Sequence, residues 1–488
     1  MNDYLWTFTE ILKSIDGYGP VTGGVFGIAI DNRETYPGDL FIALPGNRTD
    51  GHKFVKKAFG MGAAAALVSK KPRGLRSNDP RLIWVPDTYE ALLKMAATAR
   101  VRSAAKIIAV TGTAGKTGTK DALAAALGMR GLTHSSIKSF NNHVGVPLSL
   151  ARLPRNAEFG VFEVGMSAPG DIAPLARLIR PHVALITTIG AGHLGAFASE
   201  EEIAREKAAI FEGLSTAGTV ILNRDNTQFV LLKNLATSRG IKRILDFSTH
   251  DLAATAILLE RQTDGRSSQV AAKIGGVRVD YRIALPGRHW VTNSLGVLVA
   301  VEALGGDLGL AGLALATLVP QDGRGALYDI LSDQKNFQVV DESYNANPAS
   351  MAATLEVFAE LKPHVGLGRK IAVLGDMEEL GSRAGDEHLS LIPMILAAKV
   401  DVLYLKGKRM GALQKALKKE IKIVAMKSNA GIFKRLSKDI EDGDLILVKG
   451  SRAGGLDEIV DQLLALHEET ESETNEKIGW GAPVAAAE

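Results

Sequence analysis

The chain has 488 residues, of which 46% are hydrophobic and 23% charged, and its formal net charge is +3. This length exceeds a single hydrophobic core, so two to four domains are expected, and the composition is that of a globular protein. The small net charge, without a basic stripe interleaved with aromatic residues, does not indicate nucleic-acid binding. The absence of cysteine excludes disulfides, zinc–thiolate sites and thiol catalysis.

Neither a signal peptide nor a membrane span is predicted. Residues 1–13 contain acidic side chains and no apolar run, which does not fit a signal peptide. The longest apolar stretch, residues 294–319, contains Glu302, Asp307 and several glycines, which favours buried helices. We therefore expect a cytoplasmic protein, with a monomer as the expected state.

Residues 1–103 are predicted to form a first, small α/β unit. Four short apolar runs, at 26–30, 38–44, 63–68 and 82–85, are typical of strands. Four polar residues lie at strand ends, where ligands are often held: Asp31, Arg33, Asp50 and His52. Turn residues and surface charges are the alternative interpretation, and the pattern alone leaves both open.

A phosphate-binding loop is predicted at the start of the second unit. An apolar run at 107–110 leads into Gly112-Thr113-Ala114-Gly115-Lys116-Thr117-Gly118, and a helix is expected over 121–127. The glycines let backbone N–H groups approach phosphate oxygens, and the helix N-terminus and Lys116 add positive charge. Thr117 offers a hydroxyl to Mg²⁺. Val110 stands where the longer form of this motif has its first glycine, so a structural turn remains an alternative.

Residues 104–325 make up this second unit. Near-continuous apolar runs alternate with helical segments, which predicts a parallel sheet covered on both faces. Glu163, His193 and Asp225 lie at or just past the carboxyl ends of such runs, where ligands bind. Because a buried Glu is costly unless paired or bound to a cation, a Mg²⁺ ligand is favoured for Glu163 over a structural salt bridge. A lone His193 is more often an ordinary loop histidine.

A helix predicted over 199–211 carries a lysine on its apolar stripe. Ser199 and Glu202 form a capping box at its start. Lys207 lies four residues after Ile203, on the face predicted to point inward. It either extends its amine to the surface or has a lowered pKa and takes part in chemistry, and the pattern does not decide between these.

Residues 326–468 are predicted to form a third unit with its own βα alternation. Its strands are expected at 337–340, 371–374, 402–405, 421–425 and 445–448. Dense polar clusters follow two of them, at 341–348 and 374–381, and are hard to explain as loops alone. Residues 469–488 are acidic and then rich in Gly, Ala and Pro, which predicts a disordered tail.

The ordered set of motifs resembles the Mur ligases, a family of ATP-dependent amide-forming enzymes of cell-wall precursor synthesis. The short phosphate loop is the family's own form. The segment Ser343-Tyr344-Asn345-Ala346-Asn347-Pro348 resembles most specifically the branch that adds a dipeptide, and the resemblance extends to the tail. It implies an α/β fold of three domains: a small N-terminal substrate domain, a central P-loop-type ATPase domain with a parallel sheet, and a C-terminal Rossmann-like domain.

The resemblance also implies roles for individual residues. Lys116 would hold the β- and γ-phosphates of ATP, Thr117 and Glu163 would bind Mg²⁺, and His193 would bind a second Mg²⁺. Lys207 matches the lysine that the family carbamylates with CO₂. Further ATP contacts would come from the loop residues Gly112 to Gly118 and from Asn293, Arg324 and Asp341. Substrate contacts would come from Asp31, Arg33, Asp50, His52, Asn141, Asn142, Tyr344, Asn345 and Asn347.

The implied reaction is ATP-dependent ligation of D-alanyl-D-alanine to UDP-N-acetylmuramoyl-tripeptide through an acyl phosphate. One alternative is another Mur or folylpolyglutamate-type amide ligase, against which the 344–348 segment argues. The alternative from a different class is a non-catalytic nucleotide-binding protein. Five positions depart from the family pattern. Ala114 stands where Asn or Ser is usual, Trp290 where Asn is usual, Asn32 where Ser is usual, Glu342 where Asp is usual and His143 where an acidic residue is usual.

Overall fold

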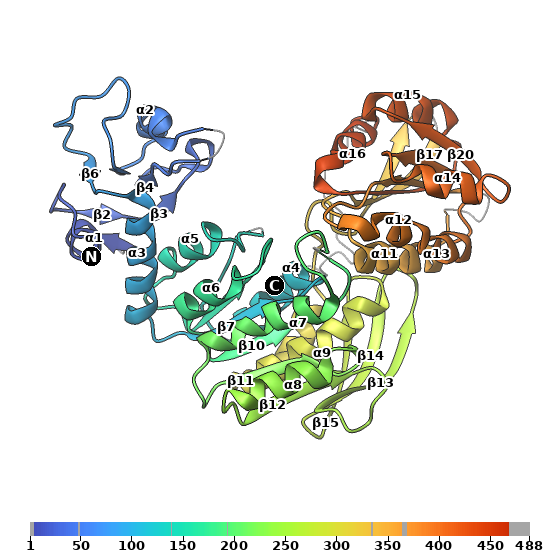
Figure 1. Cartoon of the computed structure of the whole chain (residues 1–488), viewed down its shortest axis with the longest axis horizontal. Coiled ribbons are helices and arrows are strands. Elements are labelled where there is room, and N and C mark those ends of the chain that lie inside the picture. The colour runs from blue at the N-terminus through green and yellow to red at the C-terminus, as the bar shows by residue number, and fades with distance from the viewer. Residues whose placement is uncertain are drawn as a thin grey trace, which may run out of the picture.

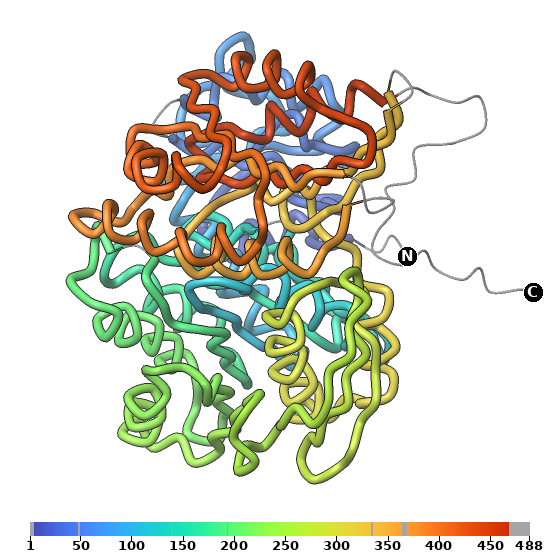
Figure 2. The backbone as a smooth tube through the Cα atoms, turned by 90° about the vertical axis from the view of Figure 1, so that its right-hand side faces the viewer, coloured from blue at the N-terminus to red at the C-terminus, as the bar shows by residue number. Residues whose placement is uncertain are grey.

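The computed structural model describes residues 4–46, 49–137, 139–192, 194–332, 335–363 and 368–467. Within these residues the chain forms three α/β units, each built around its own main sheet, in agreement with the expected fold class. In Figure 1 the N-terminal and C-terminal units lie on opposite sides above the central one. Figure 2, turned by 90°, shows the C-terminal unit above the central unit. The predicted tail at 469–488 lies outside the described residues, as does His193.

The N-terminal unit is organised by a parallel sheet, whose described strands have the order β3-β4-β5-β6. Its first helix begins at a capping box in which Thr7 and Glu10 satisfy each other's backbone N–H groups. The strands are β1 (Trp6–Thr7), β2 (Gly24–Val25), β3 (Gly27–Ala29), β4 (Asp39–Ile42), β5 (Ala65–Val68) and β6 (Leu82–Trp84). The helices are α1 (Phe8–Ile15), α2 (Val55–Gly60) and α3 (Thr88–Arg102).

Helix α3 joins this unit to the central one. It packs along α5 (Gly145–Ala151), which is buried throughout, and Leu148 and Ala151 of α5 belong to the same apolar cluster as the N-terminal sheet. The indole N–H of Trp6 donates to the carbonyl of Ala151 at 2.8 Å. The guanidinium of Arg100 donates to the carbonyls of Ile179 and Arg180. The two units therefore share a core.

The central sheet has, among the described residues, the strand order β15-β14-β13-β12-β11-β10-β7-β9-β8. Strands β7 to β13 pair in parallel with one another, and β14 and β15 extend the sheet beyond β13 by antiparallel pairing. The strands are β7 (Lys106–Thr111), β8 (Thr133–Ser135), β9 (Phe159–Glu163), β10 (Val183–Ile186), β11 (Thr219–Asn223), β12 (Arg243–Ser248), β13 (Ala256–Thr263), β14 (Ser268–Ile274) and β15 (Val277–Ile283).

Helices cover both faces of this sheet. One face packs against α4 (Lys116–Gly128), α9 (Arg288–Ala303) and α10 (Leu308–Leu315). The other packs against α5, α6 (Ile172–Ile179), α7 (Glu200–Ala208) and α8 (Phe229–Ser238). Strands buried from both sides read as continuous apolar runs, which is why the sequence predicted them. Among the described helices, none is long and apolar enough to cross a lipid bilayer.

The C-terminal unit has, within the described residues, a sheet of order β16-β17-β21-β18-β19-β20, parallel except for the pairing of β16 with β17. Helices α11 to α14 pack on one face and α15 and α16 on the other. The strands are β16 (Ala326–Ser332), β17 (Lys335–Glu342), β18 (Lys370–Gly375), β19 (Val402–Lys406), β20 (Lys422–Met426) and β21 (Leu445–Lys449). The helices are α11 (Pro348–Glu360), α12 (Ala384–Leu389), α13 (Ile392–Ala397), α14 (Gly411–Leu417), α15 (Asn429–Asp439) and α16 (Asp457–Leu464).

Candidate functional site

A cavity of about 1130 Å³ lies between the central and C-terminal units. Its lining comes from the loop before α4, from the carboxyl ends of β9, β10 and β11, and from the start of α9 on the central side. On the other side it comes from the segment between β17 and α11 and from the loop after β21. Carboxyl ends of parallel strands from two sheets thus meet at one site, which is where such sheets bind ligands.

The loop from Gly112 to Gly115 is shaped by close backbone approach. Gly112 and Gly115 have φ of +154° and +79°, and Gly115 caps α4. A Cβ on Gly112 would lie 1.9 Å from Oγ1 of Thr187. That hydroxyl donates to the carbonyl of Ala114 at 2.6 Å. Glycine is therefore required here by both conformation and space, as a loop that wraps phosphates needs.

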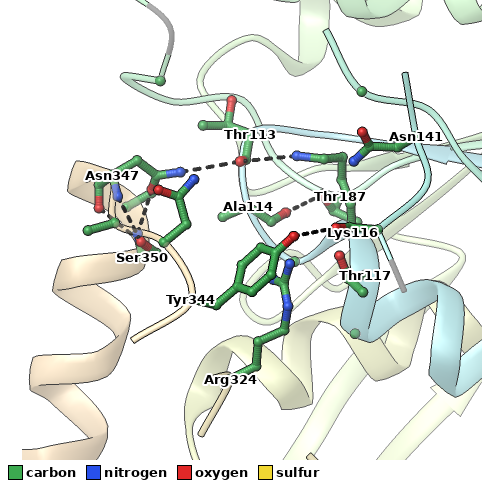
Figure 3. Close-up of a pocket in the computed structure, with 18 of the residues that line it drawn as sticks. Thr113, Ala114, Lys116, Thr117, Asn141, Thr187, Arg324, Tyr344, Asn347 and Ser350 are labelled. Atoms are coloured by element: carbon green, nitrogen blue, oxygen red, sulfur yellow. Dashed lines mark hydrogen bonds between the residues drawn. The ribbon is translucent and has the colours of Figure 1, made fainter. Parts of the chain in front are cut away.

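Lys116, the first residue of α4, extends back across this loop. Its Nζ donates to the carbonyl of Gly112 at 2.8 Å and more weakly to that of Thr113, and Figure 3 shows the side chain reaching toward Thr113. Burial lowers its pKa, against which the carboxylate of Glu163 acts to raise it. The ammonium therefore lies at the N-terminus of α4, where a phosphate chain would be held.

Glu163 ends strand β9 with one carboxylate oxygen unpaired. Oε1 accepts a hydrogen bond from Nδ2 of Asn141 at 2.6 Å, whereas Oε2 is buried without a hydrogen-bond partner among the described residues. The residue is 1% exposed and lines the cavity. A buried carboxylate oxygen without a partner is unfavourable unless a cation occupies the site. Among the described residues no group of three or more His, Asp or Glu side chains is placed to hold a metal by itself.

Lys207 is 1% exposed and points inward from α7. Its Nζ lies 3.6 Å from Sδ of Met166, which lines the cavity. Burial and the nearby Lys116 ammonium lower the pKa of Lys207 well below its ordinary value. Of the two interpretations left open by the sequence, the structure favours the buried amine with a lowered pKa over a side chain that reaches the surface.

The start of α9 forms another wall of the cavity. His289, Trp290 and Asn293 line it, and Nδ2 of Asn293 and the Trp290 ring lie so close to Gly115 and Gly118 that a Cβ on either glycine would meet them at 2.6 and 2.4 Å. Burial lowers the pKa of His289 to about 4, and its Nδ1 is buried without a partner in the described structure.

The C-terminal unit contributes an aromatic residue between the units. The guanidinium of Arg324 lies 4.0 Å from the ring centre of Tyr344, and that of Arg452 lies at 5.4 Å. The Tyr344 hydroxyl hydrogen-bonds to Ser139 of the central unit. Nδ2 of Asn347 donates to the carbonyl of Thr113 at 3.4 Å, and Figure 3 shows both C-terminal residues facing the loop.

Not all predicted site residues line this cavity. Asp341 lies behind it, where its carboxylate accepts hydrogen bonds from the backbone N–H groups of Gly323 and Ser343 and from the Ser343 hydroxyl. Burial raises the pKa of Asp341. Lys207 also stays behind the lining. The cavity does contain Asn141, Asn142 and Asn345, together with the residues described above.

The four candidates of the N-terminal unit form two separate pairs. The Arg33 guanidinium binds both oxygens of Asp31, which also caps the short helical turn Asn32–Glu34. Nδ1 of His52 lies 2.7 Å from Asp50, and its Nε2 accepts from the backbone N–H of Ser69 at 3.0 Å, so Nδ1 is the protonated nitrogen. Although burial alone would raise it, the pKa of Asp50 is held below its ordinary value by Lys70 and His52.

Sequence reasoning missed Thr187 and Met166. Thr187 fixes the loop through Ala114, and Asn223 in turn donates to the carbonyl of Thr187 at 3.1 Å. Thr187 directly follows the apolar strand β10, and Asn223 is the last residue of β11. A polar residue at the carboxyl end of a buried strand was the signal that could have identified them. The contact of Met166 with Lys207 joins residues 41 positions apart and has no signal in the sequence.

Three family models match the chain. Their descriptions are "Mur ligase family, catalytic domain" for residues 25–100, "Mur ligase middle domain" for 110–301 and "Mur ligase, glutamate ligase domain" for 328–452. The chain is also 34% identical to the UDP-N-acetylmuramoyl-tripeptide–D-alanyl-D-alanine ligase of Rickettsia prowazekii, over 89% of this chain and 94% of that one. The ligase of the same name from Escherichia coli K12 is 34% identical, over 89% and 92%.

Solved structures agree in fold. The crystal structure of MurF from Acinetobacter baumannii matches with a TM-score of 0.79 and 27% identity, over 94% of this chain and 99% of that one. The structure of MurF ligase from Thermotoga maritima in complex with ADP matches with a TM-score of 0.71, over 90% and 97%. At 24% identity this second likeness supports the fold alone.

Proposed function

The chain belongs to the Mur ligase family, and we propose that it joins D-alanyl-D-alanine to UDP-N-acetylmuramoyl-tripeptide in a reaction driven by ATP. The observation that carries this proposal is one cavity that contains the Lys116 loop, the Tyr344–Asn347 segment of the C-terminal unit and a carboxylate oxygen of Glu163 that has no partner among the described residues. The two ligases that share 34% identity with this chain carry the name of this reaction.

The reaction has two steps. The terminal carboxylate of the tripeptide attacks the γ-phosphate of ATP, the bond to the β-phosphate oxygen breaks, and an acyl phosphate and ADP result. The amine of D-alanyl-D-alanine then attacks the acyl carbonyl, phosphate leaves with the C–O bond electrons, and the amine loses a proton. Since phosphoryl transfer is accelerated mainly by positioning and charge, the protein's part is to hold the reacting groups and stabilise their charge.

Several residues have parts in this proposal. Lys116 and the N–H groups of the loop hold the β- and γ-phosphates, and Asn293 and Arg324 contact the nucleotide. Tyr344, Asn345 and Asn347 lie where the dipeptide enters, with Asn141 and Asn142 opposite. Asp341 would close over the nucleotide together with Arg324, and it accepts a hydrogen bond from the N–H of Gly323, the residue before Arg324. The pairs Asp31–Arg33 and Asp50–His52 bind the UDP-sugar end.

The unpaired Oε2 of Glu163 fits a divalent cation, because a hard oxygen ligand in a phosphate site is what Mg²⁺ prefers. Thr117 and Glu163 would hold this ion, and His193 a second one. Bound Mg²⁺ would neutralise charge on the transferring phosphoryl group.

Lys207 is proposed to carry a carbamate. Carbamate formation requires a neutral amine, which attacks CO₂ and releases a proton. Burial and the repulsion from Lys116 support this, since both favour the neutral amine. The resulting carboxylate-like group would lie beside Met166 at the edge of the cavity.

Phosphate release tests the proposal directly. ATP is supplied with UDP-N-acetylmuramoyl-tripeptide, with and without D-alanyl-D-alanine, and both phosphate and the pentapeptide product are measured. We expect phosphate release to depend on both substrates. Release with glutamate in place of the dipeptide would favour another amide ligase of the family, and nucleotide binding without any amide product would favour a binding protein.

A further inference from the structure

One segment of the C-terminal unit is far more basic than the rest of the chain. Of the 33 residues from 406 to 438, eleven are Lys or Arg and one, Glu420, is acidic. The whole chain has 57 basic and 54 acidic side chains, so the remainder carries an excess of acidic groups. A charge asymmetry of this kind indicates an anionic partner more than it affects folding.

The fold brings these charges to one edge. Strand β20 is the last strand of the sheet, and α14 and α15 flank it on opposite faces. Eight lysines on these elements and their connections are exposed, and none forms an ion pair with another described residue. We call them the lysine edge: Lys408, Lys415, Lys418, Lys419, Lys422, Lys427, Lys434 and Lys438.

The ordinary role of edge lysines explains only part of this set. A lysine on an edge strand prevents pairing with another chain. Only Lys422 lies within β20, and Lys427 follows its end. The other six lie on or beside the helices, where they do not guard the strand, and six unpaired like charges repel one another.

The lysine edge also lies away from the reaction site. No residue from 406 to 438 lines the large cavity. Figure 1 places α15 at the top and α14 and β20 at the right of the C-terminal unit, whereas α11 faces the central unit. The charges therefore do not serve to hold the nucleotide, and a partner bound there would leave the cavity open.

We propose that the lysine edge binds the surface of a membrane that contains anionic phospholipids. Clusters of four to eight basic side chains on a surface are attracted to such lipids. Nine of the eleven basic residues are lysines. The lysine ammonium is a point charge that needs no fixed partner geometry, which suits the diffuse negative charge of a lipid surface. Protein interfaces, by contrast, are enriched in Arg and depleted in Lys.

Other anionic partners fit the segment less well. Its only aromatic residue, Phe433, is half-buried and packs against the core, so no stacking platform for a single-stranded nucleic acid is available. None of the large apolar side chains from 406 to 438 is exposed. Attachment is therefore electrostatic, without insertion, and falls steeply with ionic strength. The acidic neighbour Asp439 is already bound by Arg435 and the Tyr404 hydroxyl.

Vesicle co-sedimentation of the full chain tests this proposal. Vesicles of phosphatidylglycerol with phosphatidylethanolamine are compared with vesicles of phosphatidylcholine at low salt. We expect binding to the anionic vesicles only. The triple variant Lys415→Glu, Lys418→Glu and Lys419→Glu should weaken it by on the order of 100-fold, because each basic side chain near an anionic surface contributes about fivefold.

The matched control reverses three exposed lysines of the N-terminal unit: Lys13→Glu, Lys56→Glu and Lys57→Glu. It has the same net charge as the first variant and should retain vesicle binding to within a few fold. Phosphate release by both variants shows that they are folded. Absent binding, equal binding to neutral vesicles, equal loss in both variants, or tighter binding to a DNA duplex than to vesicles would each overturn the proposal.

Discussion

Lys207 is the residue for which burial has the clearest chemical consequence. Its amine has the thioether of Met166 as its hydrogen-bond partner, so a charged ammonium at this position is poorly solvated. We expect Lys207→Ala to lower phosphate release by at least about 100-fold, which is the usual cost of losing one electrostatic group in a site.

Short carboxylic acids such as formate should restore part of the activity of Lys207→Ala, because they supply the carboxylate that the carbamate provides. Lys233→Ala, which removes an exposed lysine from α8, serves as the control and should behave like the unaltered protein. Unchanged activity of Lys207→Ala would rule out the carbamate role.

Glu163 offers a separate prediction about the metal. Glu163→Gln keeps the acceptor for Asn141 but removes the charge of the unpaired oxygen. The Mg²⁺ concentration needed for half-maximal activity, and for thermal stabilisation in the presence of ADP, should rise by at least about tenfold. Glu158→Gln, an exposed glutamate just before the same strand, should leave both values unchanged. An identical Mg²⁺ response of the two variants would remove Glu163 from the metal site.

His134 predicts how stability depends on pH. Burial lowers its pKa to about 4 from an ordinary value of 6.5, and Nε2 bonds to the carbonyl of Ser149. Between these two pH values the unfolded chain binds a proton that the folded chain does not. The contribution to stability is therefore complete above pH 6.5 and is lost as pH falls toward 4, by about 1.4 kcal/mol per pH unit.

The test compares unfolding midpoints at pH 7 and pH 4.5. The drop in midpoint should be smaller in His134→Asn than in the unaltered protein, whatever the absolute stability of the variant. A drop of equal size in both would show that other groups cause the acid sensitivity.

The role of a single residue could be predicted from the sequence where the residues that it contacts are close to it in the chain. The phosphate loop is a contiguous motif, so its residues could be chosen directly. Lys207 could be placed on an inward face from helical spacing, but what it meets could not, because Met166 comes from a different element. Asp341 is predicted to contact the nucleotide, and the structure adds that both its oxygens accept hydrogen bonds from the chain itself. No sequence pattern predicts which hydrogen-bond donors a buried carboxylate will meet in the fold.

At the scale of elements, the junction between the phosphate loop and α4 depends on a glycine. Gly115 has φ of +79°, and a Cβ would lie 2.6 Å from Nδ2 of Asn293. Gly115→Ala therefore costs about 1–2 kcal/mol in backbone strain and displaces Asn293. We expect the KM for ATP to rise by at least about tenfold.

Gly128, the last residue of the same helix, provides the control. A Cβ on it has nothing within 4 Å, so Gly128→Ala should leave the KM for ATP unchanged and slightly stabilise the helix. If the two alanine variants bind ATP equally well, the loop geometry is not what holds the phosphates.

The elements that the sequence predicted are those with one clear periodic signal. Strands buried on both faces, such as β7 and β10, were evident as apolar runs. Strands β8, β12, β13 and β16 were not, because each mixes polar or half-exposed residues without regular alternation. They are stabilised by pairing with a neighbouring strand, and this tertiary effect overrides local propensity. The addition of β14 and β15 to the edge of the central sheet has no local signal in the sequence, because it depends on pairing with β13.

At the scale of the whole molecule, the two outer units are joined to the central one differently. The N-terminal joint is the buried α3–α5 contact with its hydrogen bonds from Trp6 and Arg100. The C-terminal joint contains Gly323 and Gly325, both with positive φ, around Arg324. Contacts between these two units include the ion pairs Arg261–Glu360 and Arg288–Glu356 and the hydrogen bond from Asn347 to Thr113. We therefore expect the C-terminal unit to close over bound nucleotide while the N-terminal unit keeps its position.

The absence of cysteine makes this measurable, because pairs of introduced cysteines can carry spin labels at chosen positions. Labels at Lys418 and Lys233 report on the C-terminal unit, and labels at Lys57 and Lys233 on the N-terminal unit. On addition of a non-hydrolysable ATP analogue with the tripeptide substrate, the first distance distribution should shift and narrow. The second should stay as it is. A shift of the second distance alone would show that the N-terminal unit moves instead, and would contradict the prediction.

Helix α3 has one more consequence. Its 15 residues form a rod of about 22 Å that runs from the strand ends of the N-terminal unit to the first strand of the central sheet. If the sugar nucleotide is anchored at Asp31 and Asp50 and the reacting carboxylate must reach Lys116, the fixed joint that α3 makes between the two units sets the span that the substrate has to bridge. Because this joint is rigid, the distance between the two anchoring points is fixed, and the substrate must match it in length. A muramoyl monopeptide or dipeptide would bind at its nucleotide end and still present its carboxylate short of the phosphate, so selection for the tripeptide would come from length as much as from any contact with its side chains.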